Sequence, residues 1–420
     1  MRPLPFTMLL AVLVTLFGAE ALAQPAAPRE LPTRGASAQP SGLSLARLLP
    51  GQENAGAAAA IEQLQAAGAT VEDEANEAGD EFKVVTWYGD NAGLESLYGV
   101  PDLRWLDLSR TNITDEGLAA IRGLRQLRVL KLQQTRVTDA GLAQLRGMQA
   151  LEGLALHDTK ITAVGLANLA EMPNLKILNL SWTNSGDEGM TTVGRLEDLE
   201  ELYLYDAKVT DAGVAQLAAL ARLRMLKLSY NEITDRSFPA LARMPSLGVV
   251  WLDYTNVSDA GLAHLPSMPA LYGLSLAGTQ VTDGGLRYVG SARNLAMLDL
   301  TNLPVTDAGI GPLMRCPNLS VLTLAGTEIG NAALAPVSRL RMLASLDVSG
   351  TKIDDNGLRK IVALSGLMKL NVARTNVTDD MLPLLRSWPQ LVELDVRGTR
   401  VSEAAIAQVS QALPNLKITH

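Results

Sequence analysis

The sequence contains few cysteines, histidines and aromatic residues, and each shortage excludes a class of protein. Cys316 is the only cysteine among 420 residues, so an internal disulfide is impossible. Three histidines offer little for a metal centre, which needs several such ligands converging on one point. Aromatic residues make up 4% of a chain that is 47% hydrophobic. The core must therefore be built from aliphatic side chains, as in repeat proteins, rather than as the large irregular core of an enzyme.

Positive charge and long apolar segments are also scarce. The chain has 36 Lys and Arg against 44 Asp and Glu, for a net charge of −8. This balance disfavours binding to nucleic acid or to an anionic membrane surface, because both attract basic proteins. Beyond the N-terminal segment no apolar run reaches the ~20 residues that a membrane-spanning helix needs. We therefore expect no membrane insertion of the mature chain.

The N-terminal segment has the features of a secretory signal. Arg2 supplies positive charge, residues 9–17 form a short apolar run, and Ala21-Leu22-Ala23 fits a cleavage site before Gln24. We interpret residues 1–23 as a signal peptide that directs export to the periplasm or the outside of the cell. A retained N-terminal anchor is the alternative. Residues 24–53, rich in Pro, Ala, Ser and Gly, are expected to be a flexible linker.

The rest of the sequence repeats itself with a 24-residue period. The pattern Leu103-x-x-Leu106-x-Leu108 recurs without insertion as far as Leu391-x-x-Leu394-x-Val396. One step back stands Phe82-x-Val84, which gives fourteen units, numbered here from the one that contains Phe82. A broken fifteenth unit ends at Leu416-Lys417-Ile418, one residue out of step. We assign residues 82–420 to the repeats.

Each unit shows two periodicities in succession. Leu-x-Leu alternates, which predicts a strand, and the following apolar residues recur every third position, which predicts a short helix or 3₁₀ turn. A Thr-Asp pair stands between them in most units, and it is expected to cap exposed N–H groups at the positive helix end. A ladder of calcium ions is the alternative for these carboxylates. They are Asp115, Asp139, Asp187, Asp211, Asp235, Asp259, Asp283 and Asp307.

This pattern resembles the leucine-rich repeat, with Thr in place of the usual Asn at the ninth position. The Thr-Asp-x-Gly-Leu segment is similar to ribonuclease-inhibitor-like and F-box-type repeats and to bacterial tandem arrays. The resemblance implies an α/β fold: a right-handed solenoid with parallel strands on the concave face and short helices outside. It says little about function. Residues 54–81 precede the repeats and are expected to form an N-terminal helical cap, with Ile61 and Leu64 facing inward.

The inner face is the most informative surface of the predicted solenoid. In each unit the residue between the strand leucines and the two residues after them should point away from the core. Six of the thirteen Trp and Tyr residues fall on these positions between Trp182 and Tyr254, in units five to eight, whereas units nine to fourteen present mostly small residues. The candidate binding residues are Trp182, Tyr203, Tyr205, Asp206, Tyr230, Trp251, Asp253 and Tyr254.

Exposed aromatic clusters are typical of contact surfaces, so we expect this face to bind a protein partner. A polysaccharide on the same side chains is the alternative, and mutual stacking that stiffens the solenoid is a second one. Asp206 and Asp253 as a glycosidase pair is a third, although no general-acid environment is apparent. The sequence has no phosphate loop, nucleophile elbow or zinc signature. We therefore expect no enzyme activity, cofactor or metal, and a solvated His157.

Overall fold

The computed structural model describes residues 53–76 and 80–420. The chain divides into residues 1–50 and residues 51–420, and the repeats lie in the second part. The expected signal peptide lies outside the described residues, as does the expected linker up to residue 52. The described part shows the predicted alternation of strands and helical turns throughout.

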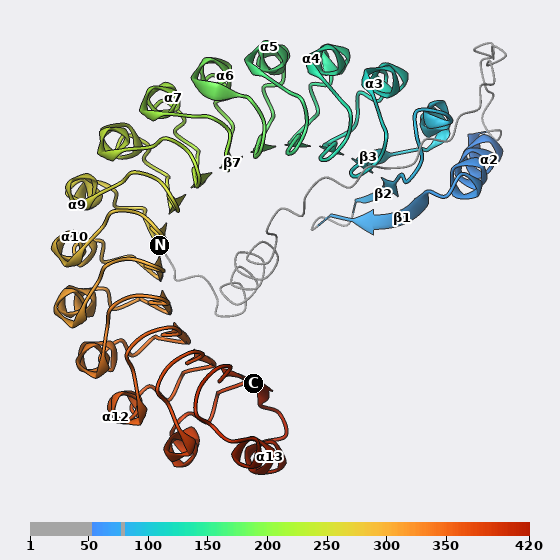
Figure 1. The fold of residues 1–420 in the computed structure, drawn as a ribbon. Helices are drawn as coiled ribbons and strands as arrows, with labels where there is room; N and C mark the ends of the chain where they lie inside the picture. Colours follow the sequence, from blue (N-terminus) through green and yellow to red (C-terminus); the bar gives the residue numbers. More distant parts are fainter. Residues whose placement is uncertain (1–52, 77–79) are drawn as a thin grey trace. The chain divides into compact units, whose positions relative to one another are not determined.

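All sixteen strands of the described residues belong to one sheet, in which strand order follows chain order. The first two strands pair antiparallel, and every later neighbour pairs parallel. Figure 1 shows the strands on the inner side of the curved repeat region and the helices on its outer side. The α/β solenoid is thus confirmed. The strands are β1 (Thr70–Ala75), β2 (Glu81–Thr86), β3 (Leu103–Asp107), β4 (Val129–Lys131), β5 (Gly153–Ala155), β6 (Ile177–Asn179), β7 (Glu201–Tyr203), β8 (Met225–Lys227), β9 (Val249–Trp251), β10 (Gly273–Ser275), β11 (Met297–Asp299), β12 (Val321–Thr323), β13 (Ser345–Asp347), β14 (Lys369–Asn371), β15 (Glu393–Asp395) and β16 (Lys417–Thr419).

The outer segments are short stretches of α-helix and 3₁₀-helix, as the three-residue spacing predicts. No helix among the described residues has the length and apolar character to cross a bilayer. The α-helices are α2 (Glu53–Ala66), α3 (Asp115–Ile121), α4 (Asp139–Leu142), α5 (Ala163–Leu166), α6 (Gly186–Val193), α7 (Asp211–Gln216), α8 (Phe238–Leu241), α9 (Asp259–Leu262), α10 (Asp283–Val289), α11 (Leu334–Val337), α12 (Asp355–Leu358) and α13 (Glu403–Ala412). The 3₁₀ segments are η1 (Leu94–Gly99), η2 (Ala143–Leu145), η3 (Ala167–Glu171), η4 (Asp235–Ser237), η5 (Leu265–Ser267), η6 (Asp307–Gly309), η7 (Gly311–Arg315), η8 (Asn331–Ala333), η9 (Arg359–Ile361) and η10 (Asp379–Ser387).

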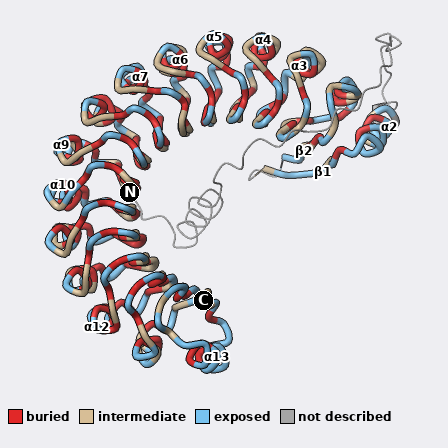
Figure 2. Tube along the Cα trace, in the orientation of Figure 1, coloured by how far each residue is buried: buried red, intermediate tan, exposed pale blue. Residues whose placement is uncertain are grey.

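The core runs through the interior of every turn of the solenoid. The repeat leucines, such as Leu106, Leu202 and Leu322, are fully buried and belong to one continuous hydrophobic cluster. Figure 2 shows buried residues along the inside of each turn and exposed residues on its surface. Cys316 is buried in this cluster, and burial raises the pKa of its thiol to about 11. It fills the core, as its position in the repeat predicts.

The Thr-Asp pairs join each unit to the next one. Asp115 Oδ1 accepts the backbone N–H of Thr138 at 2.8 Å, and the Thr138 hydroxyl donates to Asp115 Oδ2 at 2.7 Å. The hydroxyl also caps its own helix by accepting the N–H of Ala140. The expectation of capping therefore holds for Thr, whereas the Asp bonds to the following unit. The same pairing links Asp139 to Thr162, Asp187 to Thr210, Asp211 to Thr234, Asp235 to Ser258, Asp259 to Thr282 and Asp283 to Thr306.

This arrangement explains the glycine of the Thr-Asp-x-Gly-Leu segment. A Cβ atom on Gly141 would collide with Asp115 Oδ1, and one on Gly213 would collide with Asp187 Oδ1. Because the carboxylates already accept two hydrogen bonds each from the neighbouring unit, they need no ion to hold them. No group of three or more potential metal ligands occurs in residues 53–76 and 80–420.

The first unit departs from the 24-residue spacing. Past an irregularity at Lys83, Val85 pairs with Leu106, so the step between these two strands is shorter than the repeat. Val85 and Trp87 are therefore the buried residues of this strand, and Phe82 is only partly buried. The alignment of Phe82-x-Val84 with the later leucines was wrong because it carried the full period into a unit with a shorter loop. Trp87 packs against Gly89 and Gly93 in that loop.

The two ends also differ in detail from the sequence expectation. Helix α2 buries Leu64 and partly buries Ile61, but the antiparallel hairpin of β1 and β2 that follows it was not anticipated. Four of the six residues of β1 are acidic or alanine, which are types depleted in strands. At the C-terminus, Ile418 pairs with Leu394, so β16 keeps the 24-residue register although Leu416 is displaced.

Candidate binding face

The side chains of the predicted site lie on the inner face of units five to eight. Alternate residues of each strand point away from the buried leucines, so Tyr203 and Trp251 are partly exposed between buried neighbours. The two residues after each strand's last leucine continue this surface. It therefore has parallel rows of side chains that cross the strands, with one member of each row in every repeat.

Four of the predicted aromatic residues form one continuous stack. The ring centroids of Trp182 and Tyr205 are 4.7 Å apart, those of Tyr205 and Tyr230 are 4.6 Å apart, and those of Tyr230 and Tyr254 are also 4.6 Å apart. His157 extends the row, 6.3 Å from Trp182. Despite this contact, Trp182, Tyr230 and Tyr254 remain 43%, 44% and 46% exposed. The stack is thus both a packing feature and an accessible surface.

Three members of this stack have an unfavourable backbone conformation. Trp182, Tyr230 and Tyr254 have φ angles of 53°, 61° and 54°, in the left-handed region that favours Gly, Asn and Asp. The equivalent residues of later units include Gly278, Asn302, Gly326, Gly350 and Gly398, all with positive φ. Bulky aromatic residues at this position cost about 1 kcal/mol each. Stacking at about 0.5–1.5 kcal/mol per ring pair is enough to offset that cost.

Unit six departs from the usual backbone after its strand, and its member of the stack is Tyr205. Asp206 has the positive φ that is usual at its position, but Lys208 has a positive φ as well, and Ala207 replaces the Thr of most other units. Asn231 of the next unit compensates, because its Oδ1 accepts the N–H groups of Ala207 and Val209 at 3.1 and 3.0 Å. Asp206 occupies the left-handed position of this unit, so its ring comes from Tyr205, one residue earlier than in its neighbours.

A second row contains a lysine that sequence reasoning did not select. Lys227 Nζ lies 3.8 Å from the centroid of the Trp251 ring and 5.0 Å from that of Tyr203. Its exposure is only 7%. Each of these contacts is a cation–π interaction, which is strongest where water is excluded. The signal was present in the sequence: Tyr203, Lys227 and Trp251 follow one another at 24-residue steps.

The two predicted carboxylates have separate local partners. Asp253 accepts hydrogen bonds from the hydroxyls of Ser229 and Ser275 and from the N–H of Ala277. Burial raises the pKa of Asp253, against the lowering effect of these bonds and of Lys227. Asp206 forms an ion pair with Lys208. Each of the two carboxylates is therefore held by its own neighbours, and no contact joins them in the described residues.

His157 is not the solvated histidine that the sequence suggested. Its side chain is half-buried beside Trp182. The reason is tertiary: the aromatic ring of the following unit covers it. Burial also raises the pKa of Tyr205 and of Tyr230, whose hydroxyls hydrogen-bond to each other.

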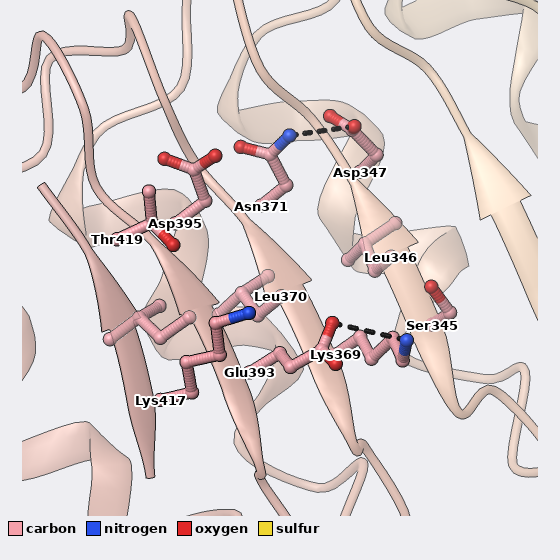
Figure 3. Close-up of a pocket in the computed structure, with 11 residues that line it drawn as sticks. Ser345, Leu346, Asp347, Lys369, Leu370, Asn371, Glu393, Asp395, Lys417 and Thr419 are labelled. Carbon is pink, nitrogen blue, oxygen red and sulfur yellow. Dashed lines mark hydrogen bonds and ion pairs between the residues drawn. The ribbon is translucent and has the colours of Figure 1, made fainter. Parts of the chain in front are cut away.

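The C-terminal part of the inner face is chemically different. An open groove over β13 to β16 has a volume of about 230 Å³. Figure 3 shows that polar side chains line it together with Leu346 and Leu370. Asn371 Nδ2 donates to Asp347 Oδ2 at 2.8 Å, and Lys369 pairs with Glu393 at 3.1 Å. None of the predicted site residues lines this groove.

Comparison with known sequences identifies the family. A model described as a leucine-rich repeat region matches residues 99–293, and a second leucine-rich repeat model matches residues 339–362. The chain is a leucine-rich repeat protein. No curated protein matches its sequence.

Solved structures of other leucine-rich repeat proteins share the fold. An internalin from Listeria monocytogenes aligns over 71% of this chain and 82% of its own, with 22% identity and a TM-score of 0.55. A leucine-rich repeat protein of Leptospira interrogans aligns over 77% and 92%, with 19% identity and a TM-score of 0.52. The mouse RP105/MD-1 complex matches over 78% and 56%, with 20% identity and a TM-score of 0.56.

Proposed function

We propose that this leucine-rich repeat protein is an exported, non-catalytic recognition module that holds a protein partner on the inner face of units five to eight. The observation that carries the proposal is the row of exposed aromatic side chains in left-handed backbone. Such side chains are typical anchors of protein interfaces. The mouse neighbour, whose structure is a complex of RP105 with MD-1, is an example of this fold in a complex with a protein.

Ring geometry favours a protein over a polysaccharide. Sugars stack on open aromatic faces. Tyr205 and Tyr230 each lie between two rings at 4.6–4.7 Å, tilted by 30–48°, which restricts access to their faces, and the Trp251 ring has Lys227 over it. The stacked rings leave edges and hydroxyls, which suit the mixed polar and apolar contacts of a protein surface. A polysaccharide remains the alternative that the experiment must separate.

The test compares Trp182→Ala and Tyr254→Ala with the matched inner-face controls Thr323→Ala and Asn371→Ala. A protein captured from the native envelope by the wild type is identified, purified and titrated against all five proteins, with a glycan array run in parallel. We expect each aromatic variant to lose about 2 kcal/mol of binding free energy, or about 30-fold in Kd. Both controls should retain wild-type affinity.

Melting temperatures of the same proteins separate binding from stiffening. If the aromatic variants bind as tightly as the wild type but melt earlier, the stack is structural and the site is elsewhere. Binding to the glycan array without a protein partner would select the polysaccharide. Export is tested by N-terminal sequencing of the protein from its native cell, which should begin at or near Gln24. A chain that keeps Met1 in the membrane fraction would contradict it.

A further inference from the structure

A cavity of about 170 Å³ opens over the start of the repeats, in units one to four. Phe82, Trp105 and Val129 form its apolar lining, and Arg104, Arg128 and Glu152 form its charged lining. None of these residues belongs to the aromatic stack or to the Tyr203–Lys227–Trp251 row. The cavity is smaller than the ~300 Å³ at which sites for drug-sized molecules begin. It has room for one ring-sized group.

The charges beside the cavity form a ladder that is incomplete at one end. Units two to seven each contribute the residue after their first leucine, and neighbours in this row form three ion pairs between opposite charges. The members are Arg104, Arg128, Glu152, Lys176, Glu200 and Arg224. Glu152 pairs with Arg128 at 3.5 Å and with Lys176 at 2.7 Å. Glu200 pairs with Arg224 at 3.5 Å. Opposite charges on adjacent strands stabilise a sheet, and like charges destabilise it.

Arg104 breaks this alternation. It is the neighbour of Arg128 on the next strand, as the hydrogen bond from the Arg128 N–H to the Arg104 carbonyl shows. Adjacent strands lie about 4.8 Å apart, so the Cα atoms of two arginines stand side by side in this row. None of the ion pairs found within residues 53–76 and 80–420 includes Arg104. Lys131, which lies 5.0 Å over the Trp105 ring, is already paired with Asp107 at 3.4 Å, so it does not alter this charge balance.

We propose that this cavity binds an organic carboxylate, whose negative charge lies between Arg104 and Arg128 and completes the ladder. The planar guanidinium fork matches a carboxylate in bidentate geometry. The apolar body of the ligand packs against Phe82, Trp105 and Val129. Arg104 is the member of the ladder that has an arginine as its neighbour, so the single negative charge of a carboxylate between the two restores the alternation. A free carboxylic acid and a carboxylate of another protein share this chemistry.

The experiment titrates the protein with phenylacetate and with its neutral isostere phenylacetamide, by calorimetry or ligand-observed NMR. A peptide ending in a free Phe carboxylate and its amidated form make the second pair. We expect at least one acid to bind about tenfold or more tighter than its amide. Binding of phenylacetate assigns the site to free acids, whereas binding of the peptide acid alone assigns it to a protein carboxylate.

Arg104→Gln should weaken the binding of that acid at least about tenfold, because it removes the charge without touching the core. Arg374→Gln, on the inner face of a distant unit, is the matched control and should have no effect. The proposal fails if neither acid binds at millimolar concentration, if acid and amide bind alike, or if Arg104→Gln binds as the wild type does. Trp182→Ala should leave this binding unchanged, so the result is independent of the function proposed for units five to eight.

Discussion

Units five to eight and units nine to fourteen share one repeating backbone, apart from the loop of unit six, but they display different side chains on the inner face. These two regions are called below the aromatic half and the small-residue half. Both keep the 24-residue period, bury the same leucine positions and pair their strands in the same register. In units five to eight the left-handed position after each strand holds Trp182, Tyr230 and Tyr254, with Asp206 in unit six. In units nine to fourteen it holds four glycines, with Asn302 and Arg374 in the other two units. The fold is therefore indifferent to what the inner face displays.

The difference indicates that the inner face of units five to eight has a property that folding alone does not require. Glycine meets the backbone requirement of this position without strain. Arg110, Gln134 and Arg374 also occupy it with positive φ, so stacking offsets the strain of the aromatic residues but is not a condition for a side chain there. Mutual stacking explains how the aromatic residues are tolerated. It does not explain why they occur in the aromatic half alone, since the small-residue half folds with the same register.

The largest expected effect tests whether the two cores are equivalent. Leu322→Asp in the small-residue half and Leu202→Asp in the aromatic half each place an unpaired charge at a fully buried position. Each should lower the free energy of unfolding by about 4 kcal/mol or more. Denaturant titration measures both, with Thr323→Ala as the surface control. A much smaller loss of stability in Leu202→Asp than in Leu322→Asp would show that the aromatic stack supports its half independently of the core.

An intermediate effect concerns a carboxylate of the small-residue half. Burial raises the pKa of Asp299 to about 6, and Asp253 and Asp347 add to this shift while Thr301 opposes it. Because the folded pKa exceeds the unfolded value of about 3.9, ionisation destabilises the folded state as pH rises from about 4 to about 6.

Asp299→Asn removes this ionisation and retains an oxygen to accept the Thr301 hydrogen bonds. The stability difference between variant and wild type should therefore grow in favour of the variant by about 2 kcal/mol between pH 4 and pH 7. Denaturant titrations at several pH values measure it. A difference that stays constant with pH would show that Asp299 has an ordinary pKa.

The smallest expected effect addresses the aromatic half directly. Tyr230→Asn relieves the left-handed strain, as in Asn302 of unit ten, but loses two ring contacts. The two effects nearly cancel, so the free energy of unfolding should fall by about 1 kcal/mol or less. Tyr230→Phe keeps both ring contacts and should match the wild type more closely. A loss several times larger would make the stack a principal source of stability and weaken the case for a binding surface.

Much of the fold could be predicted from the sequence because each unit repeats the same pattern of buried residues. Alternating leucines specify a strand with one buried side, and three-residue spacing specifies the helical turn behind it. The aromatic concentration in units five to eight was equally visible. The sequence could not show that the Tyr205 ring joins those of Trp182 and Tyr230, because that depends on how the side chains of neighbouring units pack.

The sequence by itself determined the repeat, its buried leucines and the chemical asymmetry of the inner face, since all three are periodic and local. Tertiary structure decided the contacts between units. It directed Asp115 to the Thr138 of the following unit, placed the Tyr205 ring between those of Trp182 and Tyr230, and paired Val85 with Leu106 at a shortened step. These contacts join residues about one repeat apart, so their partners depend on how successive turns are laid against one another, which no single unit encodes.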